Sequence, residues 1–315
     1  MVNVLLLLVG FVALIFGADK LVDGASNLAK KMGIPNIVIG LTIVAFGTSA
    51  PEFVVNVFAA LENSTEMVLG NVMGSNIFNV FGILGICAII YPLTVQNNTT
   101  WIEIPLSLLA AVVVLVVAND VFFDNAAANV ITRTDGLILL LFFAIFLVYN
   151  ITLSQKSDDD SDIETKHYSY LKSASFIVLG LVGLVVGGRL IVDSAVSIAQ
   201  IFGMSERVIG LTIVSIGTSL PELATSIVAV RKRNLDIAIG NVVGSNIFNI
   251  FFILGISTVI TTVPVQDASF VDIFLNILAS LLLFIFVFTG KGRRLTRWEG
   301  FVFLAIYVGY IIYLL

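Results

Sequence analysis

Long apolar runs recur along the whole chain and are separated mostly by short polar loops. A helix needs about 20 apolar residues to cross the hydrocarbon core of a bilayer. Ten stretches reach that length, some only with their flanks, at 2–25, 37–61, 67–91, 103–122, 135–153, 173–198, 207–230, 237–260, 270–289 and 297–315. The pattern therefore predicts an all-α polytopic membrane protein with ten transmembrane helices.

Composition narrows the class of protein further. The chain is 58% hydrophobic and 12% charged, whereas a soluble domain carries about 25% charged residues. Its basic residues form short loop clusters and no continuous basic face, so nucleic acid is not an expected partner. The single cysteine, Cys87, lies in an apolar stretch, which leaves no disulfide framework and no cysteine-based metal site. The expected partner is therefore the lipid bilayer, and neither a cofactor nor an obligatory protein partner is indicated.

The chain repeats itself with an offset of 170 residues, and residues 38–79 match residues 208–249 at 22 of 42 positions. The predicted organisation is a five-helix repeat at 1–153, an acidic linker at 154–172 and a second five-helix repeat at 173–315. Because five is an odd number, the second repeat enters the membrane from the opposite face. Inverted-topology repeats are typical of secondary transporters, whose substrate site lies near the midplane where the repeats meet.

Lysine and arginine are distributed unequally between the two sets of loops. One set carries Lys30, Lys31, Lys156, Lys166, Lys172, Arg231, Lys232, Arg233, Lys291, Arg293, Arg294 and Arg297, and the other carries Arg133 and Arg207. Because cytoplasmic loops carry the excess of basic residues, we expect the linker in the cytoplasm and both termini outside. The first apolar stretch has no basic region before it, so it is expected to be a retained helix rather than a cleaved signal.

The phrase Gly-Thr-Ser-Ala-Pro-Glu at 47–52 interrupts the second apolar stretch. Pro51 has no N–H, so the carbonyl of Gly47 loses its helical partner and the preceding turn is distorted. The carbonyls around Ala45 can then point into a cavity. Within hydrocarbon, freed carbonyls are tolerated only where protein, water or an ion satisfies them.

The same turn carries two further kinds of oxygen. Thr48 and Glu52 are four residues apart and therefore share one face of a helix. Carboxylate, hydroxyl and carbonyl oxygens are the ligands that Ca²⁺ and other hard cations prefer. The second half repeats this arrangement with Ser215, Gly217, Thr218, Ser219, Pro221 and Glu222. Two carboxylates together match the charge of one Ca²⁺.

A second phrase, Gly-Asn-Val-Met-Gly-Ser-Asn-Ile-Phe-Asn at 70–79, recurs at 240–249 with a single change. Its two glycines are four residues apart, a spacing that lets helix backbones approach closely. Ser75 and Asn79 then share a face, as do Ser245 and Asn249. We expect these side chains to add neutral oxygen ligands beside the two glutamates.

Each feature has a structural explanation when it stands alone. Small residues at a spacing of four usually mean helix packing, and one buried glutamate can be a hydrogen-bonded structural acid. The duplication of both phrases is far more specific, and ionisable groups inside the membrane mark ion pathways. By contrast, Arg189 and Asp193 are four apart and are expected simply to pair, and Asp19, Lys20 and Asp23 are expected to be structural.

With these motifs in view, the chain resembles the sodium/calcium exchanger family of the cation/calcium antiporter superfamily, particularly its short prokaryotic members. The resemblance covers essentially the whole chain and places the family's alpha-1 and alpha-2 motifs at 40–85 and 210–255. It implies that Glu52 and Glu222 are the principal cation ligands. It further implies ligand oxygens from Thr48, Ser49, Ser75, Thr218, Ser219 and Ser245, and from the backbone carbonyls of Ala45 and Ser215.

The resemblance also implies a function, which is exchange of Ca²⁺ for Na⁺ by alternating access, with the first and sixth helices sliding across the core. Extrusion of Ca²⁺ is the expected direction. Some family members carry aspartate at the position of Asn249, and this chain has only two carboxylates, so we expect no dependence on K⁺. An H⁺/Ca²⁺ antiporter of the same fold is the nearest alternative. A cation channel is a remote alternative, and no pattern typical of a catalytic enzyme lies near the bilayer.

Overall fold

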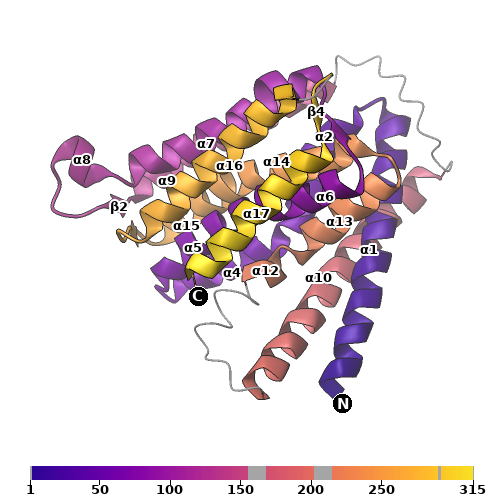
Figure 1. Ribbon diagram of the computed structural model, residues 1–315, viewed down its shortest axis with the longest axis horizontal. Helices are drawn as coiled ribbons and strands as arrows, with labels where there is room; N and C mark the ends of the chain where they lie inside the picture. Colours follow the sequence, from indigo (N-terminus) through magenta and orange to yellow (C-terminus); the bar gives the residue numbers. More distant parts are fainter. Residues whose placement is uncertain (1, 155–167, 202–214, 290–291, 315) are drawn as a thin grey trace.

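The computed structural model describes residues 2–154, 168–201, 215–289 and 292–314, which fold into a bundle of long helices (Figure 1). In the first half the elements are α1 (Val2–Met32), α2 (Asn36–Ile39), η1 (Gly40–Val44), α3 (Ala45–Thr48), α4 (Ala50–Leu61), α5 (Thr65–Ile77), η2 (Phe78–Leu84), α6 (Gly85–Ile90), β1 (Leu93–Thr94), η3 (Thr99–Glu103), α7 (Ile104–Val117), α8 (Asp120–Asp124), β2 (Val130–Ile131) and α9 (Arg133–Ser154).

The second half follows the same order. Its elements are α10 (Tyr170–Ile201), α12 (Ser215–Thr218), α13 (Leu220–Arg231), α14 (Leu235–Ile247), η5 (Phe248–Leu254), α15 (Gly255–Ile260), β3 (Val263–Pro264), α16 (Ser269–Thr289), β4 (Arg294–Leu295) and α17 (Arg297–Leu314). The η elements are π-helical turns within longer helices.

The described residues contain 8 helices that are long and apolar enough to cross a membrane, and one further bent pair. The bent pair, Asn36–Thr48 and Ala50–Leu61, changes direction by 48°. These elements lie where nine of the ten expected spans were predicted. The expected span at 207–230 falls partly outside the described residues, as does most of the linker, so the ten-helix count stays a prediction.

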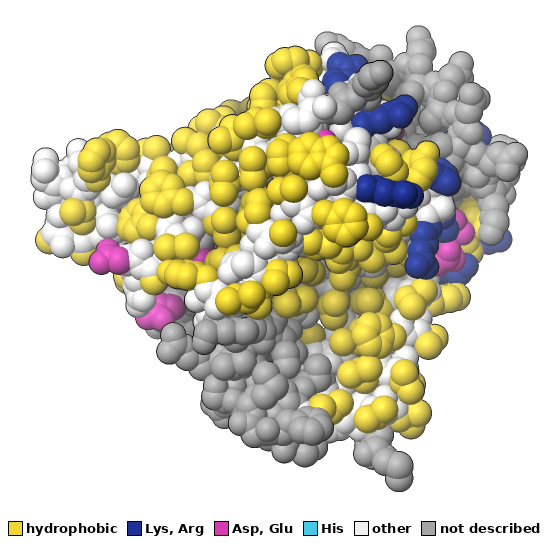
Figure 2. Space-filling model, in the orientation of Figure 1, with side chains coloured by type: hydrophobic (Ala, Val, Ile, Leu, Met, Phe, Trp, Pro, Cys, Tyr) yellow, Lys and Arg dark blue, Asp and Glu magenta, His cyan; other side chains and the backbone are white. Residues whose placement is uncertain are grey.

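The surface of the bundle is apolar enough to face lipid. Leu141 and Ile312, on α9 and α17, are 67% and 68% exposed. On the face in Figure 2, apolar side chains cover most of the described surface, while lysine and arginine gather toward one end. Large apolar groups are rarely left in water over such an area, so this surface fits a multi-pass membrane protein.

Helices α1 and α10 lie side by side and run antiparallel (Figure 1). A Cβ at Gly10 would lie 2.9 Å from the carbonyl oxygen of Gly187, and one at Gly17 would lie 2.8 Å from that of Gly180. The 170-residue offset makes Gly180 the equivalent of Gly10, and Gly187 the equivalent of Gly17. The contact is therefore reciprocal, as a two-fold axis between the helices would make it.

The short strands also pair between the two halves. Strand β1 pairs antiparallel with β4, and β2 pairs antiparallel with β3, so each short sheet joins one strand from each half. In the core, the largest fully buried side chains include Phe81 and its 170-offset equivalent Phe251. Helices α5 and α14 lie within this core, and both are largely buried.

Candidate cation site

The break between α3 and α4 places Glu52 in the centre of the bundle. Ser49 leaves helical geometry with φ −81° and ψ 7°, and Pro51 follows at the start of α4. A proline is tolerated there because the first turn of a helix has unpaired N–H groups in any case. The equivalent Ser219 has φ −91° and ψ 9°, with Pro221 at the start of α13. Both breaks fall where the sequence predicts them, and each begins a new helix whose first turn carries a glutamate.

The two glutamates are buried and bonded across the halves. Glu52 and Glu222 are each 1% exposed. The Ser49 hydroxyl donates to Glu222 Oε1 at 2.9 Å, and the Ser219 hydroxyl donates to Glu52 Oε1 at 2.9 Å. Each break in one half therefore holds the carboxylate of the other half, and the two carboxyl groups are close enough to interact electrostatically.

Six buried oxygens on α4, α5, η2 and their equivalents in the second half form three equivalent pairs that have no hydrogen-bond partner among the described residues. They are the Oε2 atoms of Glu52 and Glu222, the hydroxyls of Ser75 and Ser245, and the Oδ1 atoms of Asn79 and Asn249. The set consists of three residue types, each present once per half. A buried oxygen without a partner typically costs about 1–3 kcal/mol, so a bound cation would remove a substantial penalty.

The amide groups of the two asparagines explain why their oxygens are available. Asn79 Nδ2 donates to Asn246 Oδ1 at 3.0 Å, and Asn249 Nδ2 donates to Asn76 Oδ1 at 2.9 Å. Asn76 and Asn246 also donate to each other's backbone carbonyls, at 3.2 Å and 3.4 Å. With each –NH₂ group engaged in this way, the Oδ1 of Asn79 and of Asn249 is left as a free acceptor.

The remaining predicted ligands differ in how freely they could bind a cation. Thr48 and Ser245 face the Glu222 carboxyl, and Thr218 faces that of Glu52. The carbonyl of Ala45 already accepts from the Ser49 N–H at 3.0 Å and from the Thr48 hydroxyl at 3.3 Å. Its equivalent Ser215 begins α12, directly after residues outside the described part of the chain.

Two asparagines that the sequence analysis did not single out form hydrogen bonds with residues next to the glutamates. Asn241 Oδ1 accepts from the Thr48 hydroxyl at 3.0 Å, and its Nδ2 donates to Ser226 at 3.0 Å and to the Glu222 carbonyl at 3.3 Å. In the first half, Asn71 Nδ2 donates to Asn56 Oδ1 at 2.6 Å. Asn71 and Asn241 are equivalent under the 170-residue offset, and that duplication is the sequence signal by which they could have been found.

Other acidic groups of the described chain lie elsewhere. Glu103 is fully buried and accepts from the Tyr149 hydroxyl at 2.5 Å, and Asp272 accepts from Tyr310 at 2.7 Å. Within the described residues, no group of three or more histidine, cysteine, aspartate or glutamate side chains could hold a metal ion. A cation at this centre would therefore depend on two carboxylates and on neutral oxygens, a donor set suited to Ca²⁺ or Na⁺.

The chain is similar to known proteins over nearly its whole length. The family described as "Sodium/calcium exchanger protein" matches residues 2–152 and 172–315. The "Putative antiporter CaxA" of Alkalimonas amylolytica is 38% identical and covers 98% of each chain. The "Sodium/calcium exchanger MaX1" of Methanosarcina acetivorans is 34% identical over 99% of this chain and 98% of its own.

A solved structure gives the same result for the fold. The sodium-calcium exchanger NCX_Mj, soaked with 10 mM Na⁺ and zero Ca²⁺, matches with a TM-score of 0.84 at 33% sequence identity. The match covers 98% of both chains. The resemblance read from the motifs is thereby confirmed over nearly the full length of the chain.

Proposed function

Because the chain belongs to the sodium/calcium exchanger protein family, we propose that this membrane antiporter exchanges Ca²⁺ for Na⁺ by alternating access. The observation that carries the proposal is that both glutamates and the equivalent pairs Ser75 and Ser245, and Asn79 and Asn249, each have a buried oxygen without a hydrogen-bond partner in the described part of the chain. Relatives and a solved structure named as sodium/calcium exchangers support the pair of ions. In this proposal the protein is a transporter and catalyses no chemical reaction.

The proposed site is built from both halves. Glu52 and Glu222 supply two negative charges, and Ser75, Ser245, Asn79 and Asn249 supply neutral oxygens beside them. Ser49, Ser219, Thr48 and Thr218 complete the set, together with the carbonyls of Ala45 and Ser215. One Ca²⁺ balances both carboxylates, and Na⁺ ions compete for the same oxygens. An empty site carries two uncompensated charges in a low dielectric, which opposes its passage across the membrane unloaded.

The proposed topology is two inverted repeats of five helices, with repeats at 1–153 and 173–315 and the linker at 154–172. The antiparallel pairing of the equivalent helices α1 and α10 supports the inversion. The basic end of the molecule supports a cytoplasmic linker with both termini outside (Figure 2). In the cytoplasmic membrane, the inward Na⁺ gradient would then drive Ca²⁺ out of the cell.

The proposal is tested by Ca²⁺ uptake into liposomes that contain the purified protein. One set of vesicles is loaded with Na⁺ at equal pH on both sides, and a second set is Na⁺-free with an acidic interior. We expect uptake in the Na⁺-loaded vesicles alone, and none in either set when protein is omitted.

The second candidate function is H⁺/Ca²⁺ exchange at the same site. Its support is that two carboxylates can carry protons in place of Na⁺, and that one close relative is named only as an antiporter. Uptake driven only by the acidic interior would keep the site and replace Na⁺ by H⁺ as the coupling ion.

A further inference from the structure

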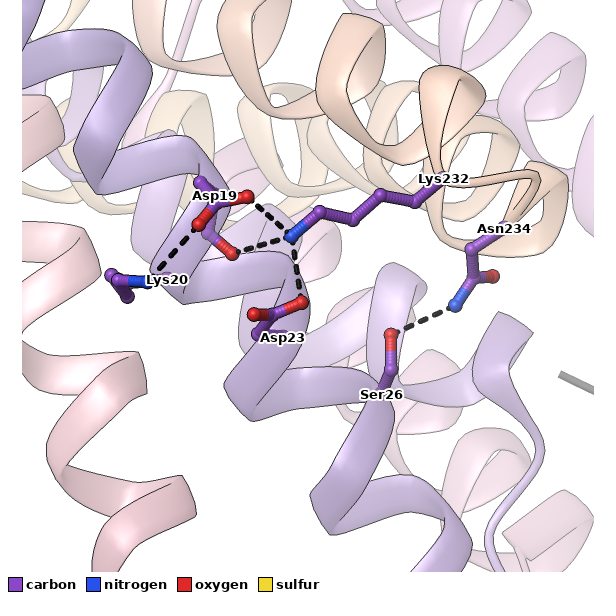
Figure 3. A network of polar contacts seen from close by, with 6 residues as sticks. All are labelled: Asp19, Lys20, Asp23, Ser26, Lys232 and Asn234. Atoms are coloured by element: carbon purple, nitrogen blue, oxygen red, sulfur yellow. Dashed lines mark hydrogen bonds and ion pairs between the residues drawn. The ribbon is translucent and has the colours of Figure 1, made fainter. Parts of the chain in front are cut away.

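A lysine in the turn directly after α13 is bound to two aspartates on α1, away from the two glutamates (Figure 3). Lys232 Nζ lies 2.6 Å from Asp19 Oδ1 and 2.6 Å from Asp23 Oδ1, and it also donates to the Asp19 carbonyl at 3.0 Å. Its side chain is 30% exposed, and that of Asp23 is 18% exposed. One cation thus holds two carboxylates in a partly buried place, where charge-assisted bonds are stronger than at the open surface.

Neighbouring polar groups fasten the same stretch of α1. Asn234 Nδ2 donates to the Ser26 hydroxyl at 2.9 Å, as Figure 3 also shows. Ser173 on α10 donates to Asn27 Oδ1 at 2.9 Å, which ties α1 to α10. The helix pair α1 and α10 is therefore fixed to the end of α13 and the start of α14 by side chains that can release it without unfolding.

The repeat predicts which residues occupy the equivalent place in the other half. Under the 170-residue offset, Lys232 corresponds to Glu62, Asp19 to Arg189 and Asp23 to Asp193. The cation and one anion have exchanged positions, so the equivalent contact would place Arg189 between Glu62 and Asp193. Each set therefore has one cation that could bridge two carboxylates, and the first set has in addition Lys20, whose Nζ lies 3.1 Å from Asp19 Oδ2.

Lys232 contacts both Asp19 and Asp23, whereas no ion pair joins Arg189 to Glu62 within the described residues. Arg189 Nε lies 3.7 Å from Asp193 Oδ2 on its own helix, with side chains 83% and 69% exposed. Glu62 is exposed, and within the described residues it forms no ion pair. Helix α1 packs along α13. The equivalent pair, α10 and α4, makes little contact within the described residues.

The two sets also lie at different levels of the helix pair. Because Gly10 faces Gly187 in an antiparallel pair, Arg189 lies level with Leu8 on α1. Asp19 is further along α1 by about 16 Å of helix rise. In this structure the pair is held at the level of Asp19 by Lys232, and no ion pair joins Arg189 to Glu62 in the part of the chain that the structure describes.

We propose that Lys232 with Asp19 and Asp23, and Arg189 with Glu62, are two alternative ion-pair latches, each of which holds the helix pair α1 and α10 at one end of its travel. This inference rests on the proposed function, because it assumes that the pair moves during the transport cycle. The structure has the first latch closed and the second open. Breaking the first latch should therefore shift the population toward the conformation in which the second is closed.

Cysteine cross-linking tests the latches without any transport assay. In a Cys87→Ala background, Glu62→Cys and Arg189→Cys are combined, and the protein is reconstituted into vesicles without ion gradients. A short bifunctional thiosulfonate reagent then links the two thiols, and linked protein is counted by intact mass. Adding Lys232→Gln should accelerate linking by about fivefold or more, the effect expected from losing partly buried charge-assisted bonds.

Arg231→Gln is the matched control, since Arg231 is the neighbouring basic residue and forms no ion pair within the described residues. It should leave the rate unchanged. The charge exchange Lys232→Asp with Asp19→Lys should return the rate toward its slow value, which also guards against a variant that merely misfolds. Equal rates in the Lys232→Gln and unsubstituted backgrounds, or no return on charge exchange, would overturn the proposal.

The result is distinguishable from failure of the proposed function. If Lys232→Gln accelerates cross-linking but the protein shows no Na⁺-driven Ca²⁺ uptake, the latches are supported and Na⁺ is rejected as the coupling ion. If Na⁺-driven Ca²⁺ uptake is normal but Lys232→Gln does not change the cross-linking rate, the proposed Na⁺/Ca²⁺ exchange is supported and the latches are rejected.

Discussion

At the scale of single residues, the two glutamates could be predicted from sequence, but their partners could not. A carboxylate within a duplicated helix break indicates an ion site, because an unpaired charge in hydrocarbon needs compensation. The sequence does not reveal that Ser49 bonds Glu222 and that Ser219 bonds Glu52. Those crossed bonds depend on how the two halves pack against each other. The spacing of residues along one helix shows which side chains share a face, but not what that face contacts in the other half.

Replacing either glutamate should stop Ca²⁺ transport. Glu222→Gln and Glu52→Gln each leave a single carboxylate, which cannot balance a divalent cation in a buried site. The measurement is Na⁺-driven Ca²⁺ uptake into liposomes. Glu66→Gln is a suitable control, since Glu66 is exposed on α5 and accepts a hydrogen bond from Gln266. Wild-type flux in Glu222→Gln would reject its role as a ligand.

The two serines at the breaks should behave alike. Ser49→Ala and Ser219→Ala each remove one donor to a buried carboxylate and one oxygen from the site. Each should raise the half-saturating Ca²⁺ concentration by about tenfold, the loss typical of a hydrogen bond to a charged group. Ser175→Ala, which removes a hydroxyl bonded only within its own helix, should have no effect. A large effect at one of the two serines alone would contradict the reciprocal arrangement.

At the scale of helices and strands, the apolar pattern predicted most elements, because every helix that crosses the lipid needs an apolar stretch of about 20 residues. The bend between α3 and α4 was also predictable, since Pro51 cannot continue the preceding helix. The π-helical turns η2 and η5 were not, although they carry Asn79 and Asn249. Such turns arise from local packing and often mark functional positions, and their residue types, Phe, Asn, Val, Ile and Leu with one Gly, do not distinguish a π-turn from the helix around it.

The close approach of α1 and α10 makes a prediction about stability. A Cβ at Gly17 would meet the backbone of Gly180 and Leu184 at 2.8 Å, so Gly17→Ala should force the helices apart. The expected loss is about 1–3 kcal/mol, as for other overpacked contacts. It is measured as a lower unfolding temperature in detergent.

Gly309→Ala provides the comparison for this substitution. Gly309 also lies in a helix, but an added Cβ there would meet nothing within 4 Å. Alanine should therefore leave stability unchanged or raise it by about 0.5–1 kcal/mol through backbone entropy. Equal losses at the two glycines would reject close packing as the cause.

At the scale of the whole molecule, the repeat implied two related halves, and the structure adds that they complete each other. The 170-residue offset identifies equivalent residues but does not show which residue meets which. The reciprocal bonds between Asn76 and Asn246 and the mixed sheets, β1 with β4 and β2 with β3, come from the pairing of the halves. Composition and period carry no information about that pairing.

In the proposed site each half contributes one carboxylate, so protons should compete with Ca²⁺ for binding to it. A carboxyl group that holds a proton cannot balance a cation, and the two acids titrate together. The half-saturating Ca²⁺ concentration should therefore rise as pH falls, with little change in maximal rate. Uptake assays at several pH values, with equal pH on both sides of the membrane, measure this. An affinity that improves toward acidic pH would contradict shared use of the carboxylates.

The crossed serine–glutamate bonds also have a consequence for ancestry. In an isologous two-fold dimer, a residue i that contacts j is matched by a j that contacts i, and this chain makes such contacts with itself at Ser49 with Glu222 and Ser219 with Glu52. A single copy of the repeated unit would carry both the serine and the glutamate, three residues apart, and could not form the crossed bonds alone. Two copies related by a two-fold axis would form both crossed bonds. Duplication of the gene for such a dimer, followed by fusion of the two copies, would give the repeat and the crossed bonds that this chain has.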